Sequence, residues 1–238
     1  MILGAVCARG GSRGVPGKAM RTLFGQPLIG IAVECGRKCP ELDAMAVSTD
    51  DTVIAETART FGAVIPCLRP QELAGHTTPK WSVFRHLVDE WERRYETRVE
   101  ILVDLDLCVP LREPEDITRC IRKLRESAAD VVITAFIPHR NPYFNMVEPD
   151  RKGGYRIVKS PDSIVHNRQE APVVYGLSPA VYAIRREVLD RFEHWSQAVM
   201  EIVEIPRRRA WDIDEEMDLK VIEAMAGWKN DDNRSKTI

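Results

Sequence analysis

The stretch from Cys7 to Lys18 combines glycines and positive charges in a way that suits a phosphate chain; it reads CARGGSRGVPGK. Its four glycines let the backbone turn sharply and approach a ligand, and its basic side chains are Arg9, Arg13 and Lys18. Because amides and basic groups in a loop before a helix form recurrent anion sites, the stretch predicts a polyphosphate-binding loop. The alternative is a glycine-rich surface turn with solvated basic residues.

Two common phosphate motifs do not describe this loop. Counting back from Gly17 and Lys18 places Ser12 where the first glycine of a Walker A loop belongs, and Ala19 stands at the position of its metal-binding hydroxyl. The glycine spacing also departs from the G-x-G-x-x-G fingerprint of dinucleotide-binding folds. The loop therefore has to be interpreted from its own residues.

Two pairs of aspartates could supply the oxygen ligands that magnesium prefers. Asp104 and Asp106 alternate within the apolar run 101–107, and Asp212 and Asp214 alternate just before a predicted helix, so each pair can point the same way. Asp106 with Asp212 or Asp214 would meet the requirement of a magnesium site beside a phosphate loop. The alternative for the second pair is helix capping, with Asp212 and Glu215 as a capping box.

Length and composition indicate an ordinary globular protein with one main core. The chain has 238 residues and a formal net charge of -2, which gives no general reason to expect nucleic acid or an anionic membrane as a partner. Its six cysteines form no metal-site spacing, which favours reduced, mostly buried thiols. With no signal peptide or membrane-spanning run in the sequence, we expect a cytoplasmic location.

Apolar periodicity predicts alternating strands and helices, and hence a three-layer α/β fold with a parallel sheet. Strands are predicted at 2–6, 44–49, 62–66, 101–107, 130–137, 172–184 and 199–205. Helices are predicted at 27–38, 53–61, 81–95 and 114–125, with Asp51 as a cap of the second, and a last helix opens at 211–218. Ligands of such sheets lie beyond the carboxyl ends of the strands, where the loop of residues 7–18 would lie.

Residues 141–159 interrupt this alternation with an aromatic segment, a Gly-Gly turn and a second extended segment. The pattern predicts an inserted β-hairpin at about 140–160, which could serve an oligomer interface or be a simple subdomain. We expect a single domain over residues 1–238, ending in a polar tail at 229–238.

The motifs along the chain resemble those of the acylneuraminate cytidylyltransferases, which make CMP-activated sialic, legionaminic and related sugar acids. The loop of residues 8–18 is similar to the signature of this family. Further similar motifs follow in family order: VSTDD at 47–51, RPQELA at 69–74, PLREPEDI at 110–117, RQ at 168–169 and DID at 212–214.

This resemblance implies a Rossmann-like, mostly parallel sheet and a homodimer formed through the inserted hairpin. It implies transfer of CMP from CTP to the anomeric hydroxyl of a 2-keto-3-deoxy (nonulosonic-type) sugar acid, with release of pyrophosphate and with Mg²⁺ as cofactor. By motif position, the triphosphate would be held by Arg9, Ser12, Arg13 and Lys18, and Arg69 would face the cytosine. Ala8 and Gly11 would also belong to the nucleotide-binding residues. Metal would be carried by Asp106, Asp212 and Asp214, which with Arg9 and Lys18 form the expected catalytic set. The sugar would be approached by Arg168, Gln169, Tyr175 and Ser178.

The chain departs from the family pattern at Ala19, at Cys108-Val109, at His76 and in the turn containing Ser178. These departures leave two alternatives open. One is a nucleotidyltransferase that uses another nucleoside triphosphate or another sugar. The other is a nucleotide-sugar binding protein that has lost turnover, although retention of Lys18 and the aspartates argues against it.

Overall fold

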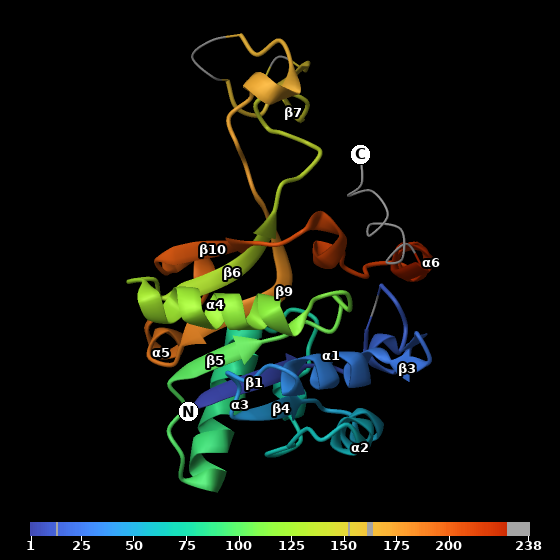
Figure 1. The fold of residues 1–238 in the computed structure, drawn as a ribbon, viewed down its shortest axis with the longest axis vertical. Helices are drawn as coiled ribbons and strands as arrows, with labels where there is room; N and C mark the ends of the chain where they lie inside the picture. The colour runs from blue at the N-terminus through green and yellow to red at the C-terminus, as the bar shows by residue number, and fades with distance from the viewer. Residues whose placement is uncertain (13, 152, 161–163, 228–238) are drawn as a thin grey trace, which may run out of the picture.

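The computed structural model describes residues 1–12, 14–151, 153–160 and 164–227 (Figure 1). Two predictions fall elsewhere: Arg13, expected to hold phosphate, and the polar tail at 229–238 lie outside the described residues.

A six-stranded sheet with the strand order β10-β6-β9-β5-β1-β4 forms the centre of the fold. Strand β1 pairs in parallel with β4 and β5, and β10 pairs in parallel with β6, whereas β9 runs antiparallel to both of its neighbours. The predicted α/β fold with a mostly parallel sheet is confirmed. The strands are β1 (Ile2–Cys7), β4 (Ala44–Ser48), β5 (Ile101–Asp104), β6 (Val131–Phe136), β9 (Gly176–Arg185) and β10 (Met200–Glu204).

Helices cover the sheet on both faces, and the alternation of side chains along the strands explains how. In β1, Ile2 and Val6 pack into the apolar cluster that also contains residues of α1, α2, α4 and α6. Leu3 and Ala5 point the other way, into the cluster with α3 and α5. The helices are α1 (Leu28–Arg37), α2 (Thr52–Thr60), α3 (Lys80–Tyr95), α4 (Pro114–Glu126), α5 (Val188–Arg191) and α6 (Glu216–Gly227).

None of the helices in the described ranges is both long enough and apolar enough to cross a membrane.

Two small hairpins and five single turns of 3-10 helix complete the described elements. The predicted hairpin within 140–160 forms from β7 (Val147–Pro149) and β8 (Tyr155–Ile157), as a two-stranded sheet separate from the central one. In Figure 1 it lies in an arm between β6 and β9 that projects away from the body. The other hairpin is β2 (Thr22–Leu23) with β3 (Gln26–Pro27), and the 3-10 turns are η1 (Lys18–Met20), η2 (Gln71–Leu73), η3 (Arg168–Glu170), η4 (Trp195–Gln197) and η5 (Arg207–Ala210).

Two strand predictions need correction. The expected strand at 62–66 forms only an isolated bridge between Ala46 and Val64. Strand β5 ends at Asp104 instead of continuing to residue 107, because the chain turns there and Val109 N donates to the carbonyl of Asp106 at 3.2 Å. Asp106 therefore lies in a turn beyond the sheet.

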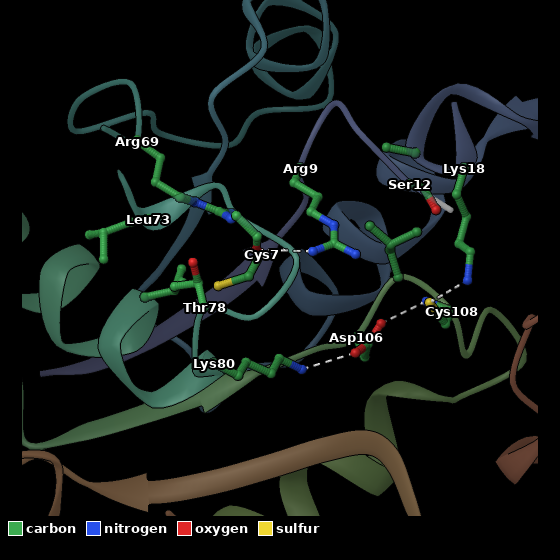
Figure 2. Close-up of a pocket in the computed structure, with 14 residues that line it drawn as sticks. Cys7, Arg9, Ser12, Lys18, Arg69, Leu73, Thr78, Lys80, Asp106 and Cys108 are labelled. Carbon is green, nitrogen blue, oxygen red and sulfur yellow. Dashed lines mark hydrogen bonds and ion pairs between the residues drawn. The ribbon is translucent and has the colours of Figure 1, made fainter. Parts of the chain in front are cut away.

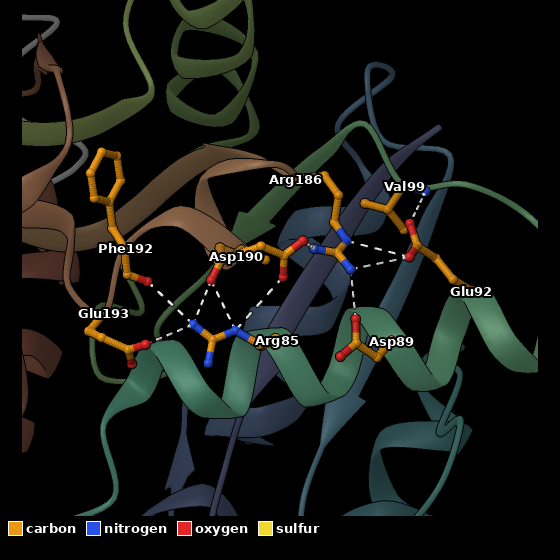
Figure 3. Close-up of polar contacts among 9 residues, drawn as sticks. Arg85, Asp89, Glu92, Val99, Arg186, Asp190, Phe192 and Glu193 are labelled. Atoms are coloured by element: carbon orange, nitrogen blue, oxygen red, sulfur yellow. Dashed lines mark hydrogen bonds and ion pairs between the residues drawn. The ribbon is translucent and has the colours of Figure 1, made fainter.

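A charged network fixes α3 against the region after β9 (Figure 3). Arg186 donates to Asp89 and Asp190, each at 2.7 Å, and to Glu92 at 3.4 Å, while only 16% of its side chain is exposed. Arg85 donates to the carbonyl oxygen of Leu189 at 2.6 Å. Ion pairs of a partly buried arginine hold geometry better than fully exposed ones, so this network helps to set the position of α3.

The capping role predicted for Asp51 is confirmed, and it gives a stability test. Asp51 Oδ1 accepts hydrogen bonds from the amides of Val53 at 2.8 Å and Ile54 at 3.1 Å, at the start of α2. Asp51→Ala should lower the free energy of unfolding by about 1 kcal/mol, measured by urea denaturation, because these amides lose their acceptor. Asp51→Asn is the matched control, since asparagine caps about as well. Equal losses in the two variants would contradict the capping role.

Candidate active site

A pocket of about 330 Å³ lies beyond the carboxyl ends of β1 and β5 (Figure 2). This is the edge of the sheet at which the sequence predicts a ligand site. Its lining brings together the loop after β1, the start of α3 and the turn after β5. The lining residues are Cys7, Arg9, Ser12, Lys18, Ala19, Arg69, Leu73, Gly75, Thr78, Lys80, Val83, Asp106, Leu107 and Cys108.

Main-chain contacts hold the loop of residues 7–18 in place. The amide of Ala8 donates to the carbonyl of Ser48 at 3.0 Å, and the amide of Gly10 donates to Asp50 Oδ1 at 3.1 Å. Gly17 has a φ of 61°, a conformation that glycine adopts without strain, and it leads directly into η1. The amino end of the loop is thereby anchored, and among the described residues other than its chain neighbours none has an atom within 4 Å of where a Cβ of Gly11 would lie.

Two of the predicted phosphate cations point into the pocket. Arg9 Nη1 donates to the carbonyl of Gly75 at 3.1 Å, and Lys18 Nζ donates to Cys108 Sγ at 3.3 Å and to the carbonyl of Ile213. Both side chains line the pocket together with Ser12. Positive groups held this way can neutralise the phosphates of a bound nucleotide without leaving their anchors.

Arg69, predicted to face cytosine, is 7% exposed and is bound largely to main chain. Its Nε donates to Ser48 Oγ at 3.0 Å, and its Nη2 donates to the carbonyls of Ser48 and, at 3.5 Å, Ala8. These bonds join the ends of β1 and β4 under the pocket. A contact of Arg69 with the base stays a prediction.

Lys80 lies between two carboxylates at the end of β5. Its ammonium donates a hydrogen bond of 2.9 Å to Asp106 Oδ2. It also lies 2.6 Å from Asp104 Oδ2, where the two charged groups form an ion pair whose geometry is not that of a hydrogen bond. Burial raises the pKa of Asp104, which has no exposed side-chain surface. Burial would also raise the pKa of Asp106, but the Lys80 ammonium and the amide of Cys108 hold it well below its ordinary value. Asp106 is therefore an anion facing the pocket.

The sequence interpretation missed Lys80, although a signal was present. Lys80 is the first residue of α3 and follows Pro79. A positive charge is unfavourable at the amino end of a helix, because the exposed amides there carry partial positive charge. A lysine at that position therefore indicates a nearby anion, which the distant aspartates supply.

Arg112, from the PLR motif, fixes the turn that carries Asp106. It is 4% exposed, and its Nη1 donates to the carbonyls of Asp106 at 2.7 Å and Ala180 at 2.8 Å. The guanidinium thus connects the turn after β5 to the neighbouring strand β9. Because the bonds go to main chain, the position of Asp106 does not depend on its own side-chain contacts alone.

The segment 212–214 reaches the same site from the far end of the chain. The amide of Ile213 donates to the carbonyl of Cys108 at 2.9 Å, and a Cβ on Gly14 would overlap the carbonyl oxygen of Asp214. Burial raises the pKa of Asp212, and Asp214 and, more weakly, Asp106 add to this effect. The charge of Asp106 therefore acts on the acidic segment at 212–214.

The predicted capping box of Asp212 and Glu215 is wrong. Helix α6 begins at Glu216, so Asp212 lies too far ahead of it to be the cap. Asp218 Oδ2 instead accepts the amides of Asp214 and Glu215, each at 2.9 Å. Asp212 is thus not used by the helix.

The donor set fits a magnesium ion that is held jointly with phosphate. Within the described part of the chain, no group of three or more His, Cys, Asp or Glu side chains could hold a metal by itself. The predicted trio of Asp106, Asp212 and Asp214 is therefore not a complete protein cage. Mg²⁺ commonly takes one or two carboxylates and fills its other positions with water and substrate phosphate, and Asp106 with Asp212 offers such carboxylates.

The residues predicted to approach the sugar do not reach this pocket. Arg168 and Gln169 form η3, where Arg168 donates to the carbonyl of Pro138 at 3.0 Å. Tyr175 is 44% exposed ahead of β9, and the buried hydroxyl of Ser178 donates to the carbonyl of Ala210 at 3.3 Å. Their predicted role is not supported by contact with the pocket and stays a prediction.

A mostly parallel sheet with a basic glycine loop at its carboxyl edge is the architecture of a nucleotide-binding α/β protein. The chain belongs to the cytidylyltransferase family, whose sequence pattern matches residues 3–225. It is accordingly an enzyme of the cytidylyltransferase class, as the resemblance predicted.

Several relatives and solved structures are similar along nearly the whole chain. A CMP-N,N'-diacetyllegionaminic acid synthase of Campylobacter jejuni is 32% identical and covers 96% of both chains. Post-translational flagellin modification protein B of Campylobacter coli is 29% identical with the same coverage. The structure of a CMP:2-keto-3-deoxy-manno-octonic acid synthetase complexed with CTP has a TM-score of 0.69 at 17% identity, covering 95% of this chain and 98% of that one. At this identity the structural likeness supports the fold.

The contact between the loop and the segment 212–214 can be tested with two glycines. Gly14→Ala should lower the free energy of unfolding by about 1–3 kcal/mol, because its new methyl group would overlap main chain that cannot rotate away. Gly11→Ala, where no described residue beyond the chain neighbours lies within 4 Å, should stay within about 0.5 kcal/mol of wild type in the same urea unfolding measurement. Similar values for both variants would mean that the segment does not pack on the loop.

Proposed function

We propose that this enzyme transfers CMP from CTP to the anomeric hydroxyl of a 2-keto-3-deoxy sugar acid of the nonulosonic type and releases pyrophosphate. The observation that carries the proposal is the juxtaposition of Arg9 and Lys18 with the anionic Asp106 in one pocket. Membership of the cytidylyltransferase family and the legionaminic acid synthase among its relatives support the choice of substrates. We also propose that the reaction takes place in the cytoplasm, the location expected from the sequence.

In the proposed reaction the sugar oxygen attacks the α-phosphorus of CTP. A bond forms between that oxygen and the α-phosphorus, the bond from the α-phosphorus to the oxygen bridging to the β-phosphate breaks, and the hydroxyl proton is lost to water. Arg9, Ser12 and Lys18 bind the phosphates and stabilise the charge that develops on the leaving pyrophosphate. Arg112 keeps the turn of Asp106 in position throughout.

Asp106 with Asp212 or Asp214 would hold a magnesium ion together with the phosphates. When bound, such an ion supplies charge neutralisation at the phosphates and lowers the pKa of a nearby hydroxyl. A dedicated histidine base is then unnecessary, and no histidine lines the pocket.

Two of the departures from the family pattern, Ala19 and Cys108, line the pocket itself. Ala19 is 3% exposed and offers no hydrogen-bonding group, while the Cys108 thiol meets Lys18 Nζ at 3.3 Å. These side chains can change which nucleoside triphosphate or sugar is preferred. A panel of substrates therefore belongs to the test.

Pyrophosphate release should be measured with each nucleoside triphosphate, in the presence of Mg²⁺, over a panel of sugar acids. We expect release with CTP and a nonulosonic acid, and a fall of about 100-fold or more in Asp106→Asn and Asp212→Asn, because the charge of each carboxylate is lost. Glu56→Gln, the same kind of change on the exposed side of α2, should leave the rate near that of wild type.

Three outcomes would count against the proposal. CTP binding without release for any pair would favour a nucleotide-sugar binding protein. Release with another nucleoside triphosphate would overturn the choice of CTP. Near-normal turnover in both aspartate variants would remove these carboxylates from the reaction.

We further propose a homodimer that forms through the arm carrying β7 and β8. The arm exposes large apolar side chains, of which Val147 is 59% exposed and Tyr155 75% exposed. Apolar surface concentrated on a projecting hairpin is typical of an interface between subunits.

Light scattering after size-exclusion chromatography should give about twice the chain mass of 27.0 kDa. Val147→Asp combined with Tyr155→Asp should shift the protein toward the monomer, because charges would have to be buried in the interface. Val53→Asp, at an exposed position of α2, is the control and should remain a dimer. A wild-type monomer, or a dimer that persists in the arm variant, would contradict this assembly.

A further inference from the structure

Lys80 forms ion pairs with two carboxylates at the same time, those of Asp104 and Asp106. Its Nζ lies 2.6 Å from Asp104 Oδ2 and 2.9 Å from Asp106 Oδ2. The same ammonium lies 5.5 Å from the ring centroids of Phe84 and Tyr182, whose faces also favour a positive charge. The arrangement holds the charge at one point of the pocket wall, as Figure 2 shows for Lys80 and Asp106.

Asp104 makes this cation necessary. Its side chain has no exposed surface, and neither of its carboxyl oxygens has a hydrogen-bond partner among the described residues. A buried carboxylate without solvation requires a compensating charge. Lys80 supplies that charge, so it cannot leave the site without cost.

Asp106 contacts the ammonium of Lys80 from the side that faces the pocket. Its Oδ1 accepts the amide of Cys108 at 3.0 Å, and its Oδ2 accepts Lys80. Both oxygens are thus engaged by the protein. A divalent cation that binds Asp106 must either displace Lys80 from Oδ2 or lie close to its positive charge, and both are unfavourable.

We propose that Lys80 is a positioning residue that acts as a built-in cation. It occupies the carboxylate of Asp106 in the free enzyme and weakens the binding of a free divalent ion. The metal ion then enters chiefly as its complex with nucleotide, whose phosphates add ligands and negative charge. The inference rests on the proposed function in one respect, namely that Asp106 is a metal ligand.

The test is the affinity of the nucleotide-free protein for Mn²⁺, followed by the electron paramagnetic resonance signal of the unbound ion. Lys80→Met should tighten Mn²⁺ binding by about tenfold or more, because a positive charge within 3 Å of the ligand oxygen is removed. Lys80→Arg, which keeps the charge, should bind like wild type. Lys38→Met, which removes a lysine with 71% side-chain exposure elsewhere, should leave the affinity unchanged.

Two double variants locate the effect and guard against misfolding. Lys80→Met with Asp106→Asn should lose the tightening, which would place the ion at Asp106. If Lys80→Met alone folds poorly, Lys80→Met with Asp104→Asn removes the buried charge that lacks a partner and should still show the tightening. Circular dichroism would confirm the fold of each variant.

Unchanged or weaker Mn²⁺ binding in folded Lys80→Met would overturn the inference, as would tightening that survives Asp106→Asn. These results are separable from a failure of the proposed function. Turnover by wild type without tightening in Lys80→Met would remove only the role of Lys80. Tightening without turnover on any substrate would support the built-in cation and reject the transferase reaction.

Discussion

Burial of the central strands on both faces is the constraint on which the site depends. In β1 and β5 nearly every side chain lies within one of the two apolar layers. Polar groups can therefore be accommodated with a small desolvation cost only where these strands end. Asp104 is the last residue of β5 and is fully buried there, and the enzyme tolerates it because Lys80 reaches it from α3. The chemistry of the pocket thus follows from where the sheet stops.

Contacts that end on main-chain groups set the frame of the pocket. The amide of Ile213 donates to the carbonyl of Cys108, Lys18 Nζ joins the loop of residues 7–18 to the carbonyl of Ile213, and Arg112 donates to the carbonyls of Asp106 and Ala180. Because Lys18 and Arg112 make their links through their side chains, the frame depends on these two residues. The side chains of Ala19 and Cys108 take part in none of these links, so replacements there can change the pocket surface and leave the frame intact.

Local patterns predicted the fold well, and contacts between distant segments marked the limit of prediction. The Asp51 cap and most helices follow from capping chemistry and apolar periodicity, which act over a few residues. Lys80 was missed because nothing in the spacing between residues 80 and 104 shows that they meet. The capping box at Asp212 failed because the true start of α6 depends on Asp218. The sugar-site prediction for Arg168 rests on the motif alone and stays a prediction; the structure places Arg168 in η3, between β8 and β9.

The bond from Lys18 to the carbonyl of Ile213 spans 195 positions along the chain. The loop of residues 7–18 also contacts Ser48 and Asp50, which are much nearer in the chain. These nearer contacts can form while the chain is still growing, whereas the bond to Ile213 cannot form before residue 213 has been made. A growing chain on the ribosome would therefore remain without this part of the pocket until its carboxyl-terminal segment has emerged and docked.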